Sequence, residues 1–327
     1  MSGCGDGFAF ARRRADLGAN FNGNRRTRMG TTMSENDSIS SPRPRGIKEI
    51  LAARPTIEGA GVHLHRAFGA AEVPRLDPFL LLDDFRSENP AEYVAGFPWH
   101  PHRGIETVTY MLDGRVEHED SLGNKGIIGS GDVQWMTSGS GIIHQEMPKV
   151  DRQRMGGFQL WVNLPKTNKM MDPRYQEVKT GQIPEVEPVR GVRMRVVAGN
   201  VNGVRGPVQD VVVDPEYLDV RLDPRTDFVH RVKPDHTVFA YLLEGRASFD
   251  EEASDLIEDG HLVIFDKGDA VRVKTRDAAT RLLLVSGRPL HEPIAWWGPI
   301  VMNNRKEIEQ AVEEFQNGTF IKRGTRS

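Results

Sequence analysis

The sequence predicts an all-β protein made of two similar barrels in tandem, followed by a short C-terminal helix. Three observations support this fold class: frequent turn-forming residues, short β-rich runs, and an internal repeat. The 327 residues include 33 Gly and 20 Pro, which interrupt the chain too often for long helices. Such a composition favours many short strands joined by turns.

The β-rich runs follow one another from Ile47 onward and are separated by turn signals. Their alternation of apolar and polar residues is typical of half-buried strands. At the C-terminal end, Asn304 offers an N-cap, and Ile308, Val312 and Phe315 recur at helical spacing. This pattern predicts one amphipathic helix. We expect strands at residues 62–68, 106–111, 127–136, 158–163, 193–197 and 217–222.

The internal repeat is the strongest indication of two domains. Residues 107–114 (TVTYMLDG) return as residues 238–245 (VFAYLLEG), 131 positions later. A Gly-Asp pair follows each copy, at residues 131–132 and 268–269. Two such units predict two β domains, most economically barrels that close to hide their sheet edges. We place them at residues 46–170 and 171–320.

Composition restricts the classes of function. A net charge of −3 provides no field for direct binding of nucleic acid or an anionic membrane. The single cysteine, Cys4, excludes an intrachain disulfide and any Cys-built metal site, which fits a reducing compartment. No run approaches the ~18 apolar residues of a membrane span, and the first twenty residues lack a signal-peptide core. We therefore expect a cytoplasmic protein.

Residues 1–45 are rich in Gly, Ser, Asn and Arg and have almost no apolar periodicity. We expect this segment to be a disordered leader. Its arginine clusters could form a nucleic-acid-binding arm, but a dispensable leader or a start at Met29 or Met33 accounts for them more simply. The sequence leaves open whether these residues belong to the mature protein.

Four side chains predict a metal site in the first domain. His100 and His102 are two residues apart, as are His144 and Glu146, and on extended strands such pairs point to one face. Imidazole and carboxylate ligands without thiolate suit Fe(II), Mn, Ni, Co or Cu. Four protein ligands leave two octahedral positions open, which is the form of a catalytic site. Ordinary strand histidines remain the alternative for a single such pair.

Other candidate ligands are less suitable. Glu106 lies four residues beyond His102, and an extended strand of that length spans roughly 13 Å, too far to share one ion without a bend. The pair His63 and His65 has no matching carboxylate and is expected on an outward face. His118 is expected on a polar rim or, at most, beside the ligands. The second domain has Arg231 and Lys233 at the positions that the repeat offset assigns to His100 and His102.

These motifs together resemble the pirin family, over residues 47 to 320. The resemblance implies two cupin barrels (double-stranded β-helix or jelly-roll), with one iron bound in the first by His100, His102, His144 and Glu146. It also implies a second barrel without metal. The segments that carry it are HPHRGIETV (100–108), HEDS (118–121), QWMT (134–137), GIIHQEMP (141–148), LDPFLLLD (76–83), QLWVNLP (159–165) and GPIVMN (298–303).

The resemblance implies a metal-dependent dioxygenase of the quercetin 2,3-dioxygenase type, acting with O₂ on a flavonol-like aromatic substrate. Glu146 is the candidate base for a substrate hydroxyl. Phe97, Trp99, Trp135 and Met136 could form apolar walls for a flat ring, or could be plain core. The alternative is an iron-dependent redox-sensing regulator that binds a transcription factor or metabolic enzyme. A monomer is the default expectation, and the sequence does not identify the physiological metal or substrate.

Overall fold

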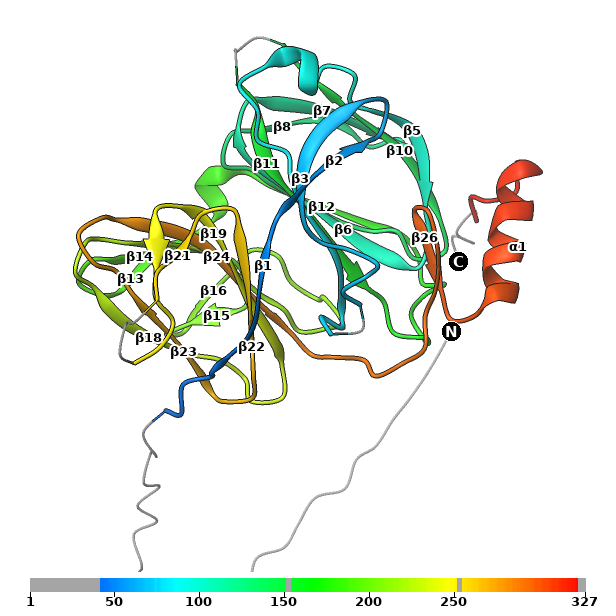
Figure 1. The fold of residues 1–327 in the computed structure, drawn as a ribbon. Helices are drawn as coiled ribbons and strands as arrows, with labels where there is room; N and C mark the ends of the chain where they lie inside the picture. The colour runs from blue at the N-terminus through cyan, green and yellow to red at the C-terminus, as the bar shows by residue number, and fades with distance from the viewer. Residues whose placement is uncertain (1–41, 74, 151–153, 252–254, 323–327) are drawn as a thin grey trace, which may run out of the picture. The chain divides into compact units, whose positions relative to one another are not determined.

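The computed structural model describes residues 42–73, 75–150, 154–251 and 255–322. Their regular structure is almost entirely β, arranged as two barrels, with one α-helix, α1 (Arg305–Gln316), near the C-terminal end (Figure 1). This confirms the predicted fold class. The predicted N-cap is also confirmed, because the Asn304 side chain accepts a hydrogen bond from the backbone N–H of Glu307 at 3.0 Å.

The first barrel combines a seven-stranded sheet with a four-stranded sheet, and all pairings are antiparallel. The larger sheet has the order β12 (Arg174–Val178), β9 (Val133–Thr137), β6 (Ile105–Asp113), β11 (Gly156–Asn163), β4 (Phe79–Asp84), β3 (Val62–Phe68) and β2 (Arg54–Glu58). The smaller sheet has the order β5 (Phe97–His102), β10 (Ile142–Pro148), β7 (Arg115–Asp120) and β8 (Lys125–Gly129).

The second barrel also contains a seven-stranded sheet, opposed by shorter ladders. The large sheet has the order β1 (Ile47–Ala52), β22 (His261–Phe265), β19 (Thr237–Glu244), β24 (Thr280–Gly287), β17 (Glu216–Leu222), β14 (Val192–Ala198) and β13 (Glu185–Val189). The ladders are β18 (Asp227–Arg231) with β23 (Ala270–Lys274), β15 (Asn200–Val201) with β16 (Val204–Arg205), and β20 (Arg246–Ala247) with β21 (Ile257–Glu258). The remaining elements are the hairpin β25 (Ala295–Trp297) and β26 (Ile300–Met302), and the 3₁₀ turns η1 (Pro90–Glu92) and η2 (Thr180–Gln182).

The internal repeat corresponds to β6 and β19, each of which has a neighbour on both sides within its large sheet. The Gly-Asp pairs, however, are not equivalent. Gly131 precedes β9, which pairs with β6, whereas Gly268 precedes β23, which pairs with β18. The true counterpart of Gly131 is Gly260 before β22, because both have a positive φ (83° and 72°) that turns the chain back along the repeat strand.

The run at residues 127–136, expected to be one strand, forms parts of two. Gly131 has a positive φ, and the turn at this residue separates β8 from β9. β8 belongs to the smaller sheet and β9 to the larger one. This turn therefore carries the chain from one face of the barrel to the other.

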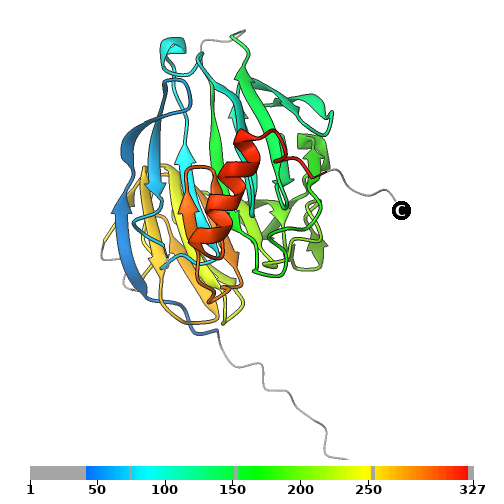
Figure 2. The same cartoon turned by 90° about the vertical axis from the view of Figure 1, so that its right-hand side faces the viewer.

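The two barrels exchange segments across the predicted division at residue 170. β1 pairs with β22 of the second barrel, and β12, which follows residue 170, pairs with β9 of the first (Figure 1). Near the other end of the chain, Ile300 and Met302 of β26 pack with Ile308 of α1 and with Ile143 of the first barrel. In Figure 2, α1 is the red helix in front of the strands. Each barrel is thus completed by a segment from the distant end of the sequence.

Packed chain also begins earlier than the predicted end of the leader at residue 45. Arg45 is only 3% exposed and donates to the carbonyls of Asp266 (3.0 Å) and Lys233 (2.9 Å). Hydrogen bonds to carbonyls fix this arginine even though its neighbours lack apolar periodicity. The leader as far as residue 41 lies outside the described residues.

The largest apolar cluster lies where the two large sheets face each other. Its members include Phe68, Phe79 and Phe239, whose rings meet edge to face at 5.2 to 5.4 Å between centroids. Burial of this surface joins the barrels into one compact unit from Pro42 onward. None of the helices in the described residues is long and apolar enough to cross a membrane.

Candidate metal centre

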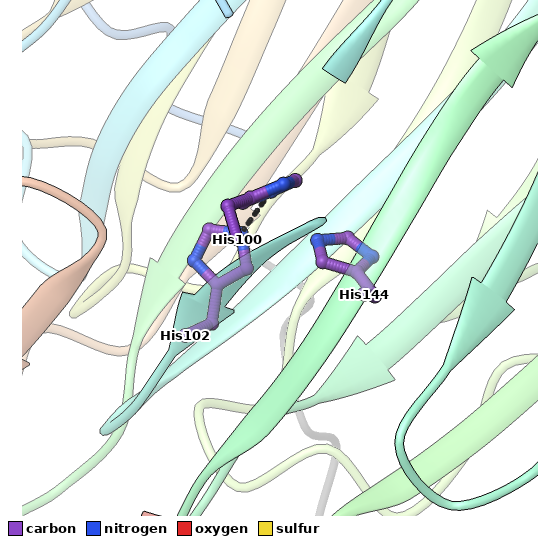
Figure 3. Close-up of side chains that lie close together, drawn as sticks. All are labelled: His100, His102 and His144. Carbon is purple, nitrogen blue, oxygen red and sulfur yellow. Dashed lines mark hydrogen bonds between the residues drawn. The ribbon is translucent and has the colours of Figure 1, made fainter. Parts of the chain in front are cut away.

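Three histidines converge from two adjacent strands of the first barrel. In the ladder between β5 and β10, His100 is directly opposite His144, and His102 is opposite Ile142. Because residues two apart on a strand share a face, His102 points to the same side as His100. One ligand nitrogen from each ring lies within 4.8 Å of the other two (Figure 3). The structure therefore brings together the three histidines named from the sequence.

Carbonyl groups set the tautomers of His100 and His102. The Nδ1 of His100 lies 2.8 Å from the Pro98 carbonyl, and the Nδ1 of His102 lies 3.1 Å from the Pro299 carbonyl. A carbonyl only accepts, so each Nδ1 carries the proton and each Nε2 keeps a lone pair. The two Nε2 atoms are 3.1 Å apart and cannot donate to each other in this state.

His144 adds a third free lone pair. Among the described residues, its Nε2 is a buried atom without a hydrogen-bond partner. Converging lone pairs without a donor between them are unfavourable in a buried site, whereas a cation placed among them would satisfy all three. The donor set therefore fits a bound divalent transition metal.

Burial keeps these ligands in the form that binds metal. His102 is 1% exposed and His144 is fully buried. Desolvation, and next the neighbouring His100, hold the pKa of both rings well below its usual value of 6.5. Both imidazoles are therefore neutral at pH 7.

Glu146 lies beside the three histidines without belonging to that close group. It follows His144 on β10, where a register shift separates the two residues, and it lines the same cavity as His100 and His102. The Thr109 hydroxyl lies 2.9 Å from its Oε1 and 2.8 Å from Oε1 of Gln159, and can donate its single proton to either. Glu106, the competing carboxylate, instead accepts a hydrogen bond from Thr137 at 2.7 Å and does not line this cavity.

The cavity beside the histidines has a volume of about 600 Å³ and mainly apolar walls. Of the four expected wall residues, Phe97 and Trp99 do line it. Trp135 and Met136 do not: both are fully buried, and Trp135 belongs to the core between the barrels. In the sequence they are near the ligands, but β9 lies in the opposite sheet from β5 and β10.

Two aromatic walls were not identified from the sequence. Trp161 of β11 contacts the His102 ring with centroids 5.1 Å apart, and Trp296 of β25 lies next to Trp161 at 6.1 Å. Trp296 and Pro299 come from nearly 200 residues beyond the first histidine pair. The sequence signals were the family-like segments at residues 159–165 and 298–303, which contain Trp161 and Pro299; Trp296 lies just before the second.

The C-terminal hairpin reaches this site because glycine leaves room for it. Gly104 has a φ of +77°, and a Cβ there would lie 2.1 Å from the Val301 carbonyl oxygen. The buried Lys169 Nζ holds the contact by donating to the carbonyls of Gly104 (3.0 Å) and Val301 (2.9 Å). Arg103 adds an ion pair to Glu314 of α1 at 2.7 Å. These contacts hold the turn after His102 against β26 and α1.

The remaining histidines have the surroundings that follow from their strands. His63 and His65 are exposed on β3, as expected. Of the two positions expected for His118, the structure shows the one beside the ligands and not the polar rim, because the side chain is fully buried. Its Nδ1 lies 3.5 Å from the Nδ1 of His144, and its Nε2 lies 3.4 Å from the Asp120 carboxylate. His118 therefore supports His144 from behind.

Comparison with known protein families gives two matches to this chain. The family model described as Pirin matches residues 61–162, and the model described as Pirin C-terminal cupin domain matches residues 217–321. The first match lies within the first barrel, and the second covers strands of the second barrel and continues through β25, β26 and α1. The regions matched together exceed half of the chain.

Individual relatives align over most of the sequence. A pirin-like protein of Caulobacter vibrioides is 44% identical and covers 84% of this chain and 99% of its own length. A Pseudomonas aeruginosa protein named "Putative quercetin 2,3-dioxygenase" is 42% identical, covering 85% of this chain and 99% of its own. A crystal structure of quercetin 2,3-dioxygenase from Acinetobacter baumannii superimposes with a TM-score of 0.79 at 31% identity, covering 85% and 99%.

Proposed function

This chain belongs to the pirin family, and on that premise we propose that its first barrel is a metal-dependent dioxygenase for flavonol-like aromatic substrates. The observation that carries the proposal is the convergence of three imidazoles at the wall of a cavity lined by aromatic side chains. A relative and a solved neighbour bear quercetin 2,3-dioxygenase names. The co-substrates are then O₂ and a small aromatic molecule.

The ligands we propose are His100, His102, His144 and Glu146, with Fe(II) as the first choice of metal. Mn, Ni, Co or Cu would fit the same donors. When bound, such a metal supplies a Lewis acid and a centre for activating O₂. The carbonyls of Pro98 and Pro299 would hold two of the imidazoles in the ligating tautomer.

The protein's own groups would bind and prepare the substrate. Trp161, Trp296 and Phe97 offer flat apolar surfaces that would contact an aromatic ring and exclude water. Glu146 would take the proton of the substrate hydroxyl at a carboxylate oxygen. The Thr109 hydroxyl, 2.9 Å from Oε1 of that carboxylate, would leave the other oxygen for this task.

Oxygen uptake tests the proposal. The full chain, purified anaerobically and loaded with Fe(II), is mixed with quercetin, and O₂ consumption is followed together with loss of the flavonol absorbance. We expect stoichiometric consumption by the wild type and none above background in His144→Ala. A folded, iron-loaded protein that consumes no O₂ with quercetin or with related catechols and enols would contradict the proposal.

Glu146→Gln separates the two roles of this carboxylate. If Glu146 is the base, the variant loses turnover while it retains part of its metal. If it serves only as a ligand, metal content and turnover fall together. Metal analysis of the same preparation distinguishes these outcomes.

A further inference from the structure

A second cavity, between the two barrels, is lined by an unusual number of arginines. It has a volume of about 710 Å³ and shares only Met155 with the cavity beside the histidines. Three carboxylates, Glu88, Asp113 and Glu244, also line it. The five arginines are Arg86 and Arg154 from the first barrel, and Arg195, Arg221 and Arg281 from β14, β17 and β24 of the second.

Strand register places these side chains in a row. On β17, Arg221 is directly opposite Arg193 of β14 and Arg281 of β24. Directly opposed residues have Cβ atoms about 4.5–5.5 Å apart, and like charges at that spacing repel. Arg195 of β14 is opposite Asp219, which lies two residues before Arg221 on β17. Arg195 and Arg221 are therefore diagonal neighbours on the same face. Arg193, Arg195, Arg221 and Arg281 therefore lie close together on one face of three neighbouring strands of the large sheet.

Most of the arginines around this cavity are neutralised by carboxylates. Arg86 pairs with Asp84 at 2.6 Å, and Arg154 with Asp113 at 2.7 Å. Arg281 pairs with Asp219 at 2.7 Å and with Glu244 at 3.3 Å. In the same row, Arg193 lies 3.6 Å from Asp223.

Arg195 and Arg221 differ from these. Arg195 donates only to neutral oxygens: the Tyr110 hydroxyl (2.7 Å), the Thr180 hydroxyl (2.8 Å) and the Gly131 carbonyl (3.1 Å) are the nearest. Arg221 is exposed and, within the described part of the chain, forms neither a hydrogen bond nor an ion pair. The carboxylate nearest to both, Asp219, is bonded to Arg281 and to the Tyr110 hydroxyl. Two positive charges on neighbouring strands thus face the cavity without a carboxylate bonded directly to either.

We propose that this groove binds a small phosphate-bearing anion between Arg195 and Arg221. Guanidinium groups bind phosphate oxygens in a bidentate manner. A tetrahedral phosphate directs its oxygens to several sides, so it can accept from two guanidinium groups that approach from different strands. The bound anion would also relieve the repulsion within the arginine row. A cavity of this size accommodates a small organic phosphate as well as the free ion.

Calorimetric titration of the full chain with inorganic phosphate tests the proposal, with glycerol phosphate as the organic arm and sodium chloride holding the ionic strength constant. We expect saturable binding at one site per chain. Arg221→Ala should weaken it at least tenfold, and Arg221→Lys should retain part of it. Because the Arg221 side chain is exposed and forms no hydrogen bond or ion pair with the described residues, both variants are expected to keep the melting temperature of the wild type.

Two further variants give the experiment its control and its specificity. Arg305→Ala makes the same charge change on α1, where the side chain is 92% exposed, and should bind phosphate as the wild type does. His144→Ala should also retain binding, because the histidine site is separate. Absence of saturable binding, an equal loss in Arg305→Ala, unchanged affinity in Arg221→Ala, or loss of binding in His144→Ala would each overturn the proposal. Tighter binding of glycerol phosphate than of phosphate would identify the ligand as an organic phosphate.

Discussion

The two barrels use the same strand framework but fill their interiors differently. In the second barrel, buried aliphatic and aromatic side chains from β14, β17, β19 and β24 pack together with Phe228 of β18 and with Val271 and Val273 of β23. In the first barrel, the corresponding strands β5 and β10 carry His100, His102 and His144. A cavity of about 600 Å³ takes up space beside them. The first barrel thus contains polar ligands and open space where the second is closely packed.

This difference shows how a duplicated fold can separate stability from chemistry. Apolar packing contributes to the stability of the second barrel without supplying reactive groups. The first barrel replaces part of that packing with imidazoles, whose burial is unfavourable until a metal satisfies them. The core between the large sheets joins the two. The closely packed second barrel can then stabilise the first barrel, which contains the cavity.

The largest expected effect is on metal content. His144→Ala removes one of three converging ligands, so we expect the variant to lose bound metal after dialysis against a weak chelator. His230, on β18 of the second barrel, is the matched control because it is 7% exposed and bonds to Glu216 at 2.7 Å. Elemental analysis of folded protein should find wild-type metal in His230→Ala. Equal loss in both variants would mean that metal binding reports general stability.

Core truncations should show the next largest difference. Leu242 is fully buried in the apolar interior of the second barrel, and Leu242→Ala should cost about 2–5 kcal/mol of unfolding free energy. Leu64 is 3% exposed but lines the cavity of the first barrel. Because its truncation enlarges a space that already exists, we expect roughly half that cost. Urea unfolding of both variants measures this, and a larger cost at Leu64 would contradict the comparison.

The buried histidines should make the metal-free protein sensitive to acid. Their folded pKa lies below the unfolded value, so between the two values the unfolded chain binds more protons. The neutral rings therefore cost no stability through titration above about pH 6.5. As the pH falls below that value, the unfolding free energy decreases by at most about 1.4 kcal/mol per pH unit for each ring.

Urea unfolding of the metal-free wild type at pH 7, 6 and 5 measures this slope. His144→Leu fills the site with an apolar side chain that cannot titrate, so its unfolding free energy should depend less on pH. An unchanged slope would assign the acid sensitivity to groups elsewhere.

The smallest expected effect concerns the orientation of Glu146. Thr109→Val removes the hydroxyl that can donate to Oε1 and nearly preserves the shape of the side chain. A hydrogen bond to a charged group contributes about 1.5–3 kcal/mol. Because the Thr109 hydroxyl also lies 2.8 Å from Oε1 of Gln159, we expect the lower end of this range, a fall in turnover of about tenfold, with metal content close to that of the wild type. Comparison of O₂ uptake with metal content tests this. Loss of metal in the variant would instead show that Thr109 holds a ligand.

The site histidines could be predicted because their arrangement is local. The pair His100 and His102 lies on one strand, and the period of two along a strand is visible in the sequence. The partner His144 repeats a spacing of two with Glu146 on a second strand. The repeat at residues 107–114 and 238–245, which form parts of β6 and β19, is likewise visible in the sequence and predicted two similar barrels.

The surroundings of the site could not be predicted in this way. Trp296 and Pro299 come from the other end of the chain, and no periodicity specifies which sheet a distant hairpin will contact. The strand β1 likewise pairs with β22 more than 200 residues away. Gly104 was a possible signal, since its missing side chain makes room for Val301, but a single glycine has many structural uses.

The contact between His102 and Pro299 has a consequence for the order in which the protein is made. A ribosome produces all three histidines before it reaches the hairpin at residues 295–302. Until that hairpin docks, the Nδ1 of His102 lacks the carbonyl that sets its tautomer, and the cavity lacks the Trp296 wall. A nascent chain that carries all three histidines therefore still lacks the finished site, and we expect metal to bind only after the hairpin has been synthesised.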